Sequence, residues 1–109
     1  MANPFDLSSM GDLMKQAKAM QERLTNLQEE VGARTVEASA GGGMVTAKVN
    51  GKMQLLAVTI DPEILRSDDR EMLQDLIVAA VNEALRQAQS MMSEEMSKLT
   101  GGLRIPGLS

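Results

Sequence analysis

The chain has 109 residues, a formal net charge of −4 and a composition that is 43% hydrophobic and 24% charged, which is typical of a single globular domain. It contains no cysteine and no histidine, so disulfides, thiolate chemistry and the commonest general base are excluded and an enzyme is not expected. No apolar run reaches the ~18 residues that span a bilayer, and the N-terminal residues do not resemble a signal peptide, so we expect a cytoplasmic protein.

The first predicted element is an amphipathic helix from about residue 10 to about residue 31, preceded by a flexible arm at residues 1–7. Ser8 or Ser9 is a candidate N-cap and Gly32 a candidate stop. The apolar seam of this helix packs on the chain's own sheet or last helix, or pairs in part with another copy, and the sequence leaves both open. Its spacings alternate between three and four, as in a heptad repeat: Met10, Leu13, Ala17, Met20, Leu24, Leu27 and Val31.

Three short β-type runs follow, and they predict an antiparallel meander. Residues 50–51 form an Asn-Gly pair, the strongest short hairpin signal, and residues 41–43 are three glycines. Two-residue loops at 41–42 and 50–51 would place Val45 opposite Ala38 and Leu56. One face of the sheet is then apolar and should face the helices: Val36, Ala38, Val45, Ala47, Val49, Leu56, Val58 and Ile60.

The second face of the predicted sheet also carries an apolar patch, formed by Met53, Leu55 and Ala57. These residues are either scattered surface apolars or the site where a second copy is buried, and we favour the second copy. The full face has a mixed character: Met44, Thr46, Lys48, Met53, Leu55, Ala57 and Thr59.

A short helical turn and a long last helix complete the domain. Asp61 followed by Pro62 is a strong helix start, and Ser67 or Asp68 is expected to cap the next helix. That helix should run from about residue 69 to about residue 99, roughly 45 Å, whereas seven-residue strands cover only about 23 Å. Its Met-rich end should therefore overhang the sheet and need another surface, which makes Met91 and Met92 candidate interface residues.

Charged residues give two candidate sites. An acidic cluster lies at the two helix starts, where capping is favoured over metal binding, so we expect no metal site: Asp61, Glu63, Asp68, Asp69 and Glu71. Basic residues are few, with Lys15 and Lys18 at i and i+3 on one helix, and Lys48 and Lys52 beside the Asn-Gly turn. Without Trp or Tyr, base stacking on single strands is not expected, so contact with DNA would be to the duplex backbone.

Four segments, spread over nearly the whole chain, carry a family resemblance: DLMKQAKAMQERL, SAGGGMVTAKVNGKMQLLAVTIDPEIL, EMLQDLIVAAVNEAL and GGLRIPGL. They closely resemble the YbaB/EbfC family of bacterial nucleoid-associated proteins. The resemblance implies an α+β subunit of order α-β-β-β-α that forms a tweezer-like homodimer over residues 1–109, with a flexible tail at 101–109. It also implies duplex DNA as the partner, limited sequence preference, a nucleoid-associated location, and a role in nucleoid organisation and gene expression.

From these observations we predict DNA-binding residues and a dimer interface, without a cofactor, small-molecule substrate or membrane partner. The alternative function is a protein-interaction adaptor that uses the Met-rich end of the last helix and the LRIPGL tail. The DNA-binding candidates are Lys15, Lys18, Arg23, Lys48 and Lys52, and the dimer-interface candidates are Met44, Met53, Leu55, Ala57, Met91 and Met92.

Overall fold

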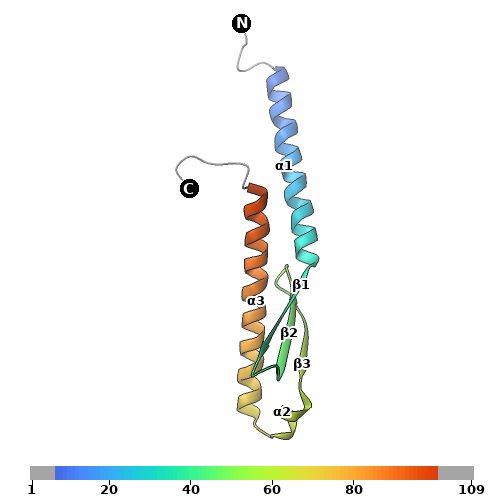
Figure 1. Ribbon diagram of the computed structural model, residues 1–109. Helices are drawn as coiled ribbons and strands as arrows, with labels where there is room; N and C mark the ends of the chain where they lie inside the picture. Colours follow the sequence, from blue (N-terminus) through green and yellow to red (C-terminus); the bar gives the residue numbers. More distant parts are fainter. Residues whose placement is uncertain (1–6, 101–109) are drawn as a thin grey trace, which may run out of the picture.

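The computed structural model describes residues 7–100 as an elongated arrangement of helices and one antiparallel sheet (Figure 1). The order of elements confirms the predicted α+β fold, α-β-β-β-α with an added helical turn. Residues 1–6 of the predicted arm and the predicted tail at 101–109 lie outside the described residues. The elements are α1 (Leu7–Ala33), β1 (Thr35–Ala40), β2 (Val45–Asn50), β3 (Leu55–Ile60), α2 (Pro62–Arg66) and α3 (Arg70–Thr100).

Helix α1 is longer than predicted, because it begins at Leu7, before both serines considered as caps, and includes Gly32. Its apolar seam is buried only towards the C-terminal end: Val31 is fully buried, whereas Met10 and Leu13 are 49% and 63% exposed. Figure 1 shows why, since α1 runs past the end of α3. Packing on the chain's own last helix therefore accounts for the C-terminal half of the seam only.

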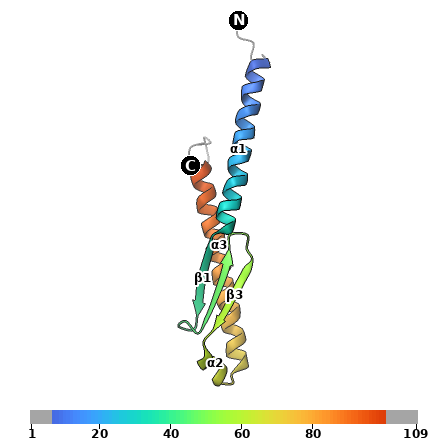
Figure 2. The ribbon, with the colours of Figure 1, turned by 90° about the vertical axis from the view of Figure 1, so that its right-hand side faces the viewer.

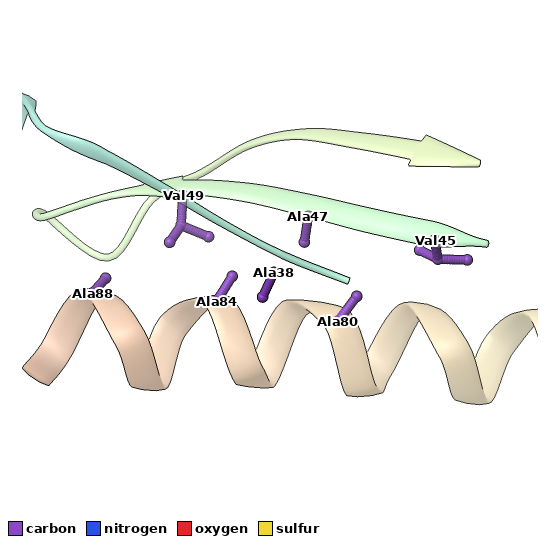
Figure 3. Close-up of a cluster of buried hydrophobic side chains, with 7 residues drawn as sticks. All are labelled: Ala38, Val45, Ala47, Val49, Ala80, Ala84 and Ala88. Atoms are coloured by element: carbon purple, nitrogen blue, oxygen red, sulfur yellow. The ribbon is translucent and has the colours of Figure 1, made fainter. Parts of the chain in front are cut away.

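The core lies between α3 and the sheet, chiefly under β1 and β2. Ala80, Ala84 and Ala88 recur every four residues, so they share one side of α3, and all are fully buried. Such small side chains let the helix backbone approach the strands closely. Figure 3 shows these alanines facing the inward side chains of β1 and β2: Ala38, Val45, Ala47 and Val49.

The register of the first hairpin was predicted wrongly, although its direction and its faces were right. Four residues, 41–44, connect β1 to β2, and Ala38 pairs with Ala47 rather than with Val45. Because the error is two residues, an even number, the apolar side chains stay on the predicted face. The glycines at 41–43 have φ of 66°, 68° and 94°, which is the conformational freedom expected of them.

The register of the second hairpin was also wrong, because the loop spans residues 51–54 and β3 contains a bulge. Val45 pairs with Ile60 rather than with Leu56, and Leu55 pairs with Val49. Leu56 is thus the extra residue of the bulge. It is 50% exposed, so the prediction that it is buried in the core was wrong. The bulge also places Leu55 on the same face as Val49, so its predicted place on the second face with Ala57 was wrong.

Helix α2 begins as predicted, with Asp61 as the N-cap and Pro62 as the first residue. The side chain of Asp61 accepts a hydrogen bond from the backbone of Glu63 at 2.9 Å. Helix α3 is capped one residue later than predicted: Asp69 Oδ1 accepts from Met72 N at 3.0 Å. Asp68 instead takes a positive φ of 58°, so the predicted caps at 67 and 68 were wrong.

The overall shape is far from a sphere. The chain measures 81 × 27 × 16 Å and has a radius of gyration of 22.0 Å, against about 13 Å for a compact chain of this length. Figures 1 and 2 show the reason: α1 and the second half of α3 project together from the end of the sheet, and α1 projects further. The overhang of α3 that its length predicted is confirmed.

Candidate nucleic-acid interface

Helix α1 carries three of the five predicted DNA-binding cations, all exposed: Lys15, Lys18 and Arg23. At 3.6 residues per turn, Lys18 lies about 60° around the helix from Lys15, and Arg23 about 80° in the other direction. Leu24, in the apolar seam, lies about 180° from Lys15. The three cations therefore occupy the polar side of the projecting helix.

The other two predicted cations lie elsewhere. Lys52 is in the β2–β3 loop, and its aliphatic stem covers Gly32 at the base of α1, where a Cβ on the glycine would be 2.9 Å from Lys52 Cγ. Gly32 is about 25 Å along the helix from Lys15. Lys48 is half-buried on the sheet face that points away from α3, and its register partner on β1 is Glu37. The structure thus groups three cations on α1 and separates Lys48 from them.

The ion pairs of the described residues involve basic residues other than the predicted DNA-binding cations. Within the described residues, Arg34 and Lys98 both contact Glu95, and Arg86 contacts Glu83. Hydrogen bonds from Arg86, and secondly from Gln87, lower the pKa of Glu83 to about 2. None of the five predicted DNA-binding cations forms an ion pair in this part of the chain, although α1 also carries the carboxylates of Asp12, Glu22, Glu29 and Glu30.

The base of α1 is held by a group of residues that we call the α1 socket: Gly32, Arg34, Asn50, Gly51 and Glu95. Asn50 is 8% exposed, and it is the only buried polar side chain among the described residues. Its Oδ1 accepts hydrogen bonds from the backbone N–H groups of Lys52 and Gln54 at 2.9 and 3.0 Å. Its Nδ2 donates to Gln54 Oε1 at 2.8 Å, so one side chain shapes the whole loop.

Gly51 places this loop directly against α1. Its N–H donates to the carbonyl oxygen of Arg34 at 3.0 Å, and a Cβ at this position would overlap the carbonyl oxygen of Val31. The positive φ of the loop, 62°, belongs to Met53 instead. The prediction that the Asn-Gly pair forms a two-residue type I′ turn was therefore wrong: the glycine is needed for close approach of two backbones.

Glu95 links the start of the sheet to α3. Its Oε1 accepts hydrogen bonds from Arg34 Nη1 at 3.1 Å and from Lys98 Nζ at 3.2 Å. These hydrogen bonds, that from Arg34 first, lower the pKa of Glu95. Sequence analysis missed this contact because Arg34 and Glu95 are 61 residues apart, and no local spacing connects them.

The predicted interface residues are spread over the molecule. Met53, Leu55 and Ala57 are exposed along β3 and the loop before it, at the edge of the sheet where α3, which packs mainly on β1 and β2, gives little cover. Met44 is half-buried in the β1–β2 turn. Met91 and Met92 are half-buried on α3, and Met92 lines a groove of about 510 Å³ between α1, α3 and the β2–β3 loop.

The described residues provide neither a metal site nor a membrane-spanning helix. Residues 7–100 contain no group of three or more acidic side chains placed to hold a metal ion, and Asp61 and Asp69 serve as helix caps. Across the same residues, no helix combines the length and apolar character that crossing a bilayer requires.

These features define an elongated α+β protein whose projecting helix carries unpaired cations. Residues 7–103 match the model of the YbaB/EbfC DNA-binding family. A nucleoid-associated protein of Pelotomaculum thermopropionicum is 54% identical over 100 residues, covering 92% of this chain and 95% of that protein. One of Syntrophobacter fumaroxidans is 55% identical over 95 residues, covering 87% and 86%.

A solved structure gives the same picture of the fold. The crystal structure of an uncharacterized protein from Helicobacter pylori superimposes with a TM-score of 0.64 at 25% sequence identity, and covers 91% of this chain and 97% of that one. The chain belongs to the YbaB/EbfC DNA-binding family. That family is described by DNA binding and not by an enzymatic reaction.

Proposed function

We propose that this protein binds duplex DNA as a homodimer in the bacterial nucleoid, through phosphate contacts made by Lys15, Lys18 and Arg23 on α1, with Lys52 at its base. The observation that carries the proposal is that Lys15, Lys18 and Arg23 are exposed on one projecting helix without an ion-pair partner in the described residues. Contacts to phosphate carry no base information, so we expect limited sequence preference. Binding of this kind at many sites should affect nucleoid organisation and gene expression.

The net charge of −4 does not oppose this function if DNA meets the Lys15/Lys18 segment rather than the whole of α1, which carries four carboxylates beside its three cations. A homodimer presents this segment twice, and DNA responds to the charges within about a Debye length, roughly 8–10 Å at physiological salt. The acidic residues at the starts of α2 and α3 lie at the opposite end of the molecule from the projecting end of α1 (Figure 1). The affinity should therefore fall steeply with salt, by about 0.9 log units per contact for each log unit of salt.

The test is the variant Lys15→Glu/Lys18→Glu in a duplex titration at several salt concentrations. We expect it to abolish the mobility shift in low salt, with the dimer intact. The matched control is Arg66→Glu/Arg70→Glu, which makes the same change in net charge at exposed positions near α2; it should bind much more tightly than the α1 variant. Equal losses in the two variants, or unchanged binding by the α1 variant, would reject the α1 interface.

The homodimer is supported by apolar surface that the single chain leaves uncovered. Leu55 and Leu56 of β3 are 48% and 50% exposed, and Met10, Leu13 and Met14 of α1 are between 49% and 71% exposed. Contiguous exposed apolar residues mark interaction surfaces, and Leu13 and Met14 on α1 and Leu55 and Leu56 on β3 are adjacent pairs of this kind. Sedimentation equilibrium at micromolar concentration tests the dimer; a folded species of monomer mass would contradict it.

An adaptor role is a second candidate, favoured by the groove described above. Its walls include Met92 and Met96 of α3 together with Thr25 and Gln28 of α1, and methionine suits adaptable interfaces. Deleting residues 103–109 distinguishes the two functions. The adaptor predicts loss of a bound protein with unchanged DNA affinity, whereas the DNA-binding function alone predicts that no partner is lost.

A further inference from the structure

The direction of α1 is decided near its C-terminal end. Residues 12–19 are exposed throughout, and α1 extends beyond α3 (Figures 1 and 2). No described neighbour therefore holds the half of the helix that carries Lys15 and Lys18. Whatever fixes the angle between α1 and the sheet must act at the α1 socket or along the short stretch where α1 and α3 touch.

The socket has two kinds of contact. The first is between backbones: Gly51 donates to the Arg34 carbonyl, and no space for a Cβ remains between Gly51 and Val31. The second is between side chains: Arg34 and Lys98 converge on one oxygen of Glu95. The first contact sets how closely the base of α1 approaches the β2–β3 loop, and the second ties the residue that follows α1 to α3.

We propose that the α1 socket aims α1, and that Gly51 and Glu95 are therefore positioning residues for DNA binding although neither needs to touch DNA. This inference rests on the proposed function. The lever arm supplies the reason: Lys15 is about 25 Å from Gly32, so a tilt of about 5° at the socket displaces Lys15 by about 2 Å. In a dimer, the same tilt on both subunits changes the separation between the two sets of cations.

Glu95 offers a test in which position and charge predict opposite results. Glu95→Gln removes one negative charge from each subunit, which on electrostatic grounds alone strengthens binding to phosphate. If Glu95 instead acts by holding Arg34 and Lys98, the same change loosens α1 and weakens binding. The matched control is Glu94→Gln, which removes the same charge from the exposed neighbouring residue.

Gly51→Ala tests the backbone contact. The added methyl group must displace the Val31 carbonyl, so the base of α1 has to move. Gly11→Ala is the control, because a Cβ there meets nothing within 4 Å and the position is also in α1. The chain has no cysteine, so the pair Gln16→Cys/Gln74→Cys reports the distance from α1 to the start of α3 by spin labelling, in labelled chains diluted with unlabelled protein.

We expect Gly51→Ala to shift the label distance and Glu95→Gln to broaden it, with DNA affinity lowered at least threefold in each. The controls should keep the wild-type distance, and Glu94→Gln should bind DNA as tightly as wild type or more tightly. Unchanged distances in Gly51→Ala and Glu95→Gln would show that the α1 socket does not set the direction of α1. Altered distances with unchanged affinity, or equal affinity changes in Glu95→Gln and Glu94→Gln, would overturn the positioning role.

Failure of the proposed function gives a different result. If wild-type protein does not bind duplex DNA at low salt, the DNA-binding proposal fails, while the label distances still decide whether the socket aims α1. If Gly51→Ala does not fold, as judged by circular dichroism, Glu95→Gln decides alone, since Glu95 lies outside the buried hydrophobic core and glutamine has nearly the same size.

Discussion

The strongest stability prediction concerns Asn50→Ala. In the structure Asn50 Oδ1 accepts from two backbone N–H groups, those of Lys52 and Gln54, and alanine leaves both without this acceptor. An unmet buried N–H costs about 1–3 kcal/mol. Lys52 and Gln54 are exposed, so water partly replaces the lost oxygen. Each of the two N–H groups therefore contributes a loss at the lower end of that range, about 1 kcal/mol. The expected destabilisation is about 2 kcal/mol, which lowers Tm by about 8–16 °C for a domain of this size.

The assay is urea unfolding followed by circular dichroism, with all variants at one protein concentration because the proposed homodimer would have a concentration-dependent midpoint. Asn50→Asp is the comparison variant. It keeps an oxygen at the δ1 position, and the amide of Gln54 can rotate to face the second oxygen, so it should cost less than half as much as alanine. A loss below about 0.5 kcal/mol for Asn50→Ala, or equal losses for the two variants, would refute the reasoning.

Three further predictions follow from single contacts. Met53→Gly should raise stability by about 1 kcal/mol, measured by urea unfolding, because Met53 has a φ of 62° that favours glycine; a loss would contradict this. Ala84→Leu should lower the free energy of unfolding by about 1–3 kcal/mol, because Ala84 is fully buried against the sheet. An unchanged free energy of unfolding would mean that α3 can move away from the sheet without loss of stability. The lowered pKa of Glu95 makes its contribution persist as the pH falls, until the pH passes through that lowered value. The α1 label distance should therefore hold from about pH 7 to about pH 5 and broaden only below 4.5, the ordinary value.

The order of elements, the capping of α2 and the overhang of α3 could all be predicted from the sequence, because each depends on short-range patterns. Asp61-Pro62 is a local signal, and the length of α3 follows from its periodicity. The strand faces were mostly predictable for the same reason: side-chain alternation has a period of two, so even errors in register leave faces unchanged.

Other features depended on contacts that local spacing does not contain. The bulge at Leu56 arises within β3 without a glycine to mark it. Gly51 was interpreted as a turn residue, whereas its position depends on the carbonyl of Val31, 20 residues earlier. The five predicted cations were chosen by type and spacing along the chain, and only the structure separates Lys48 on the sheet from the three on α1.

The four-residue repeat of alanine on α3 carries little information about where the helix sits along the strands. Sliding the helix by one repeat, about 6 Å, would return an alanine to two of the three inward positions. Alignment must come from the two ends: bulky Leu73 and Ile77 on one side of the repeat, and Glu95 on the other. Substitutions at those ends should therefore change the alignment of helix and sheet more readily than substitutions within the repeat.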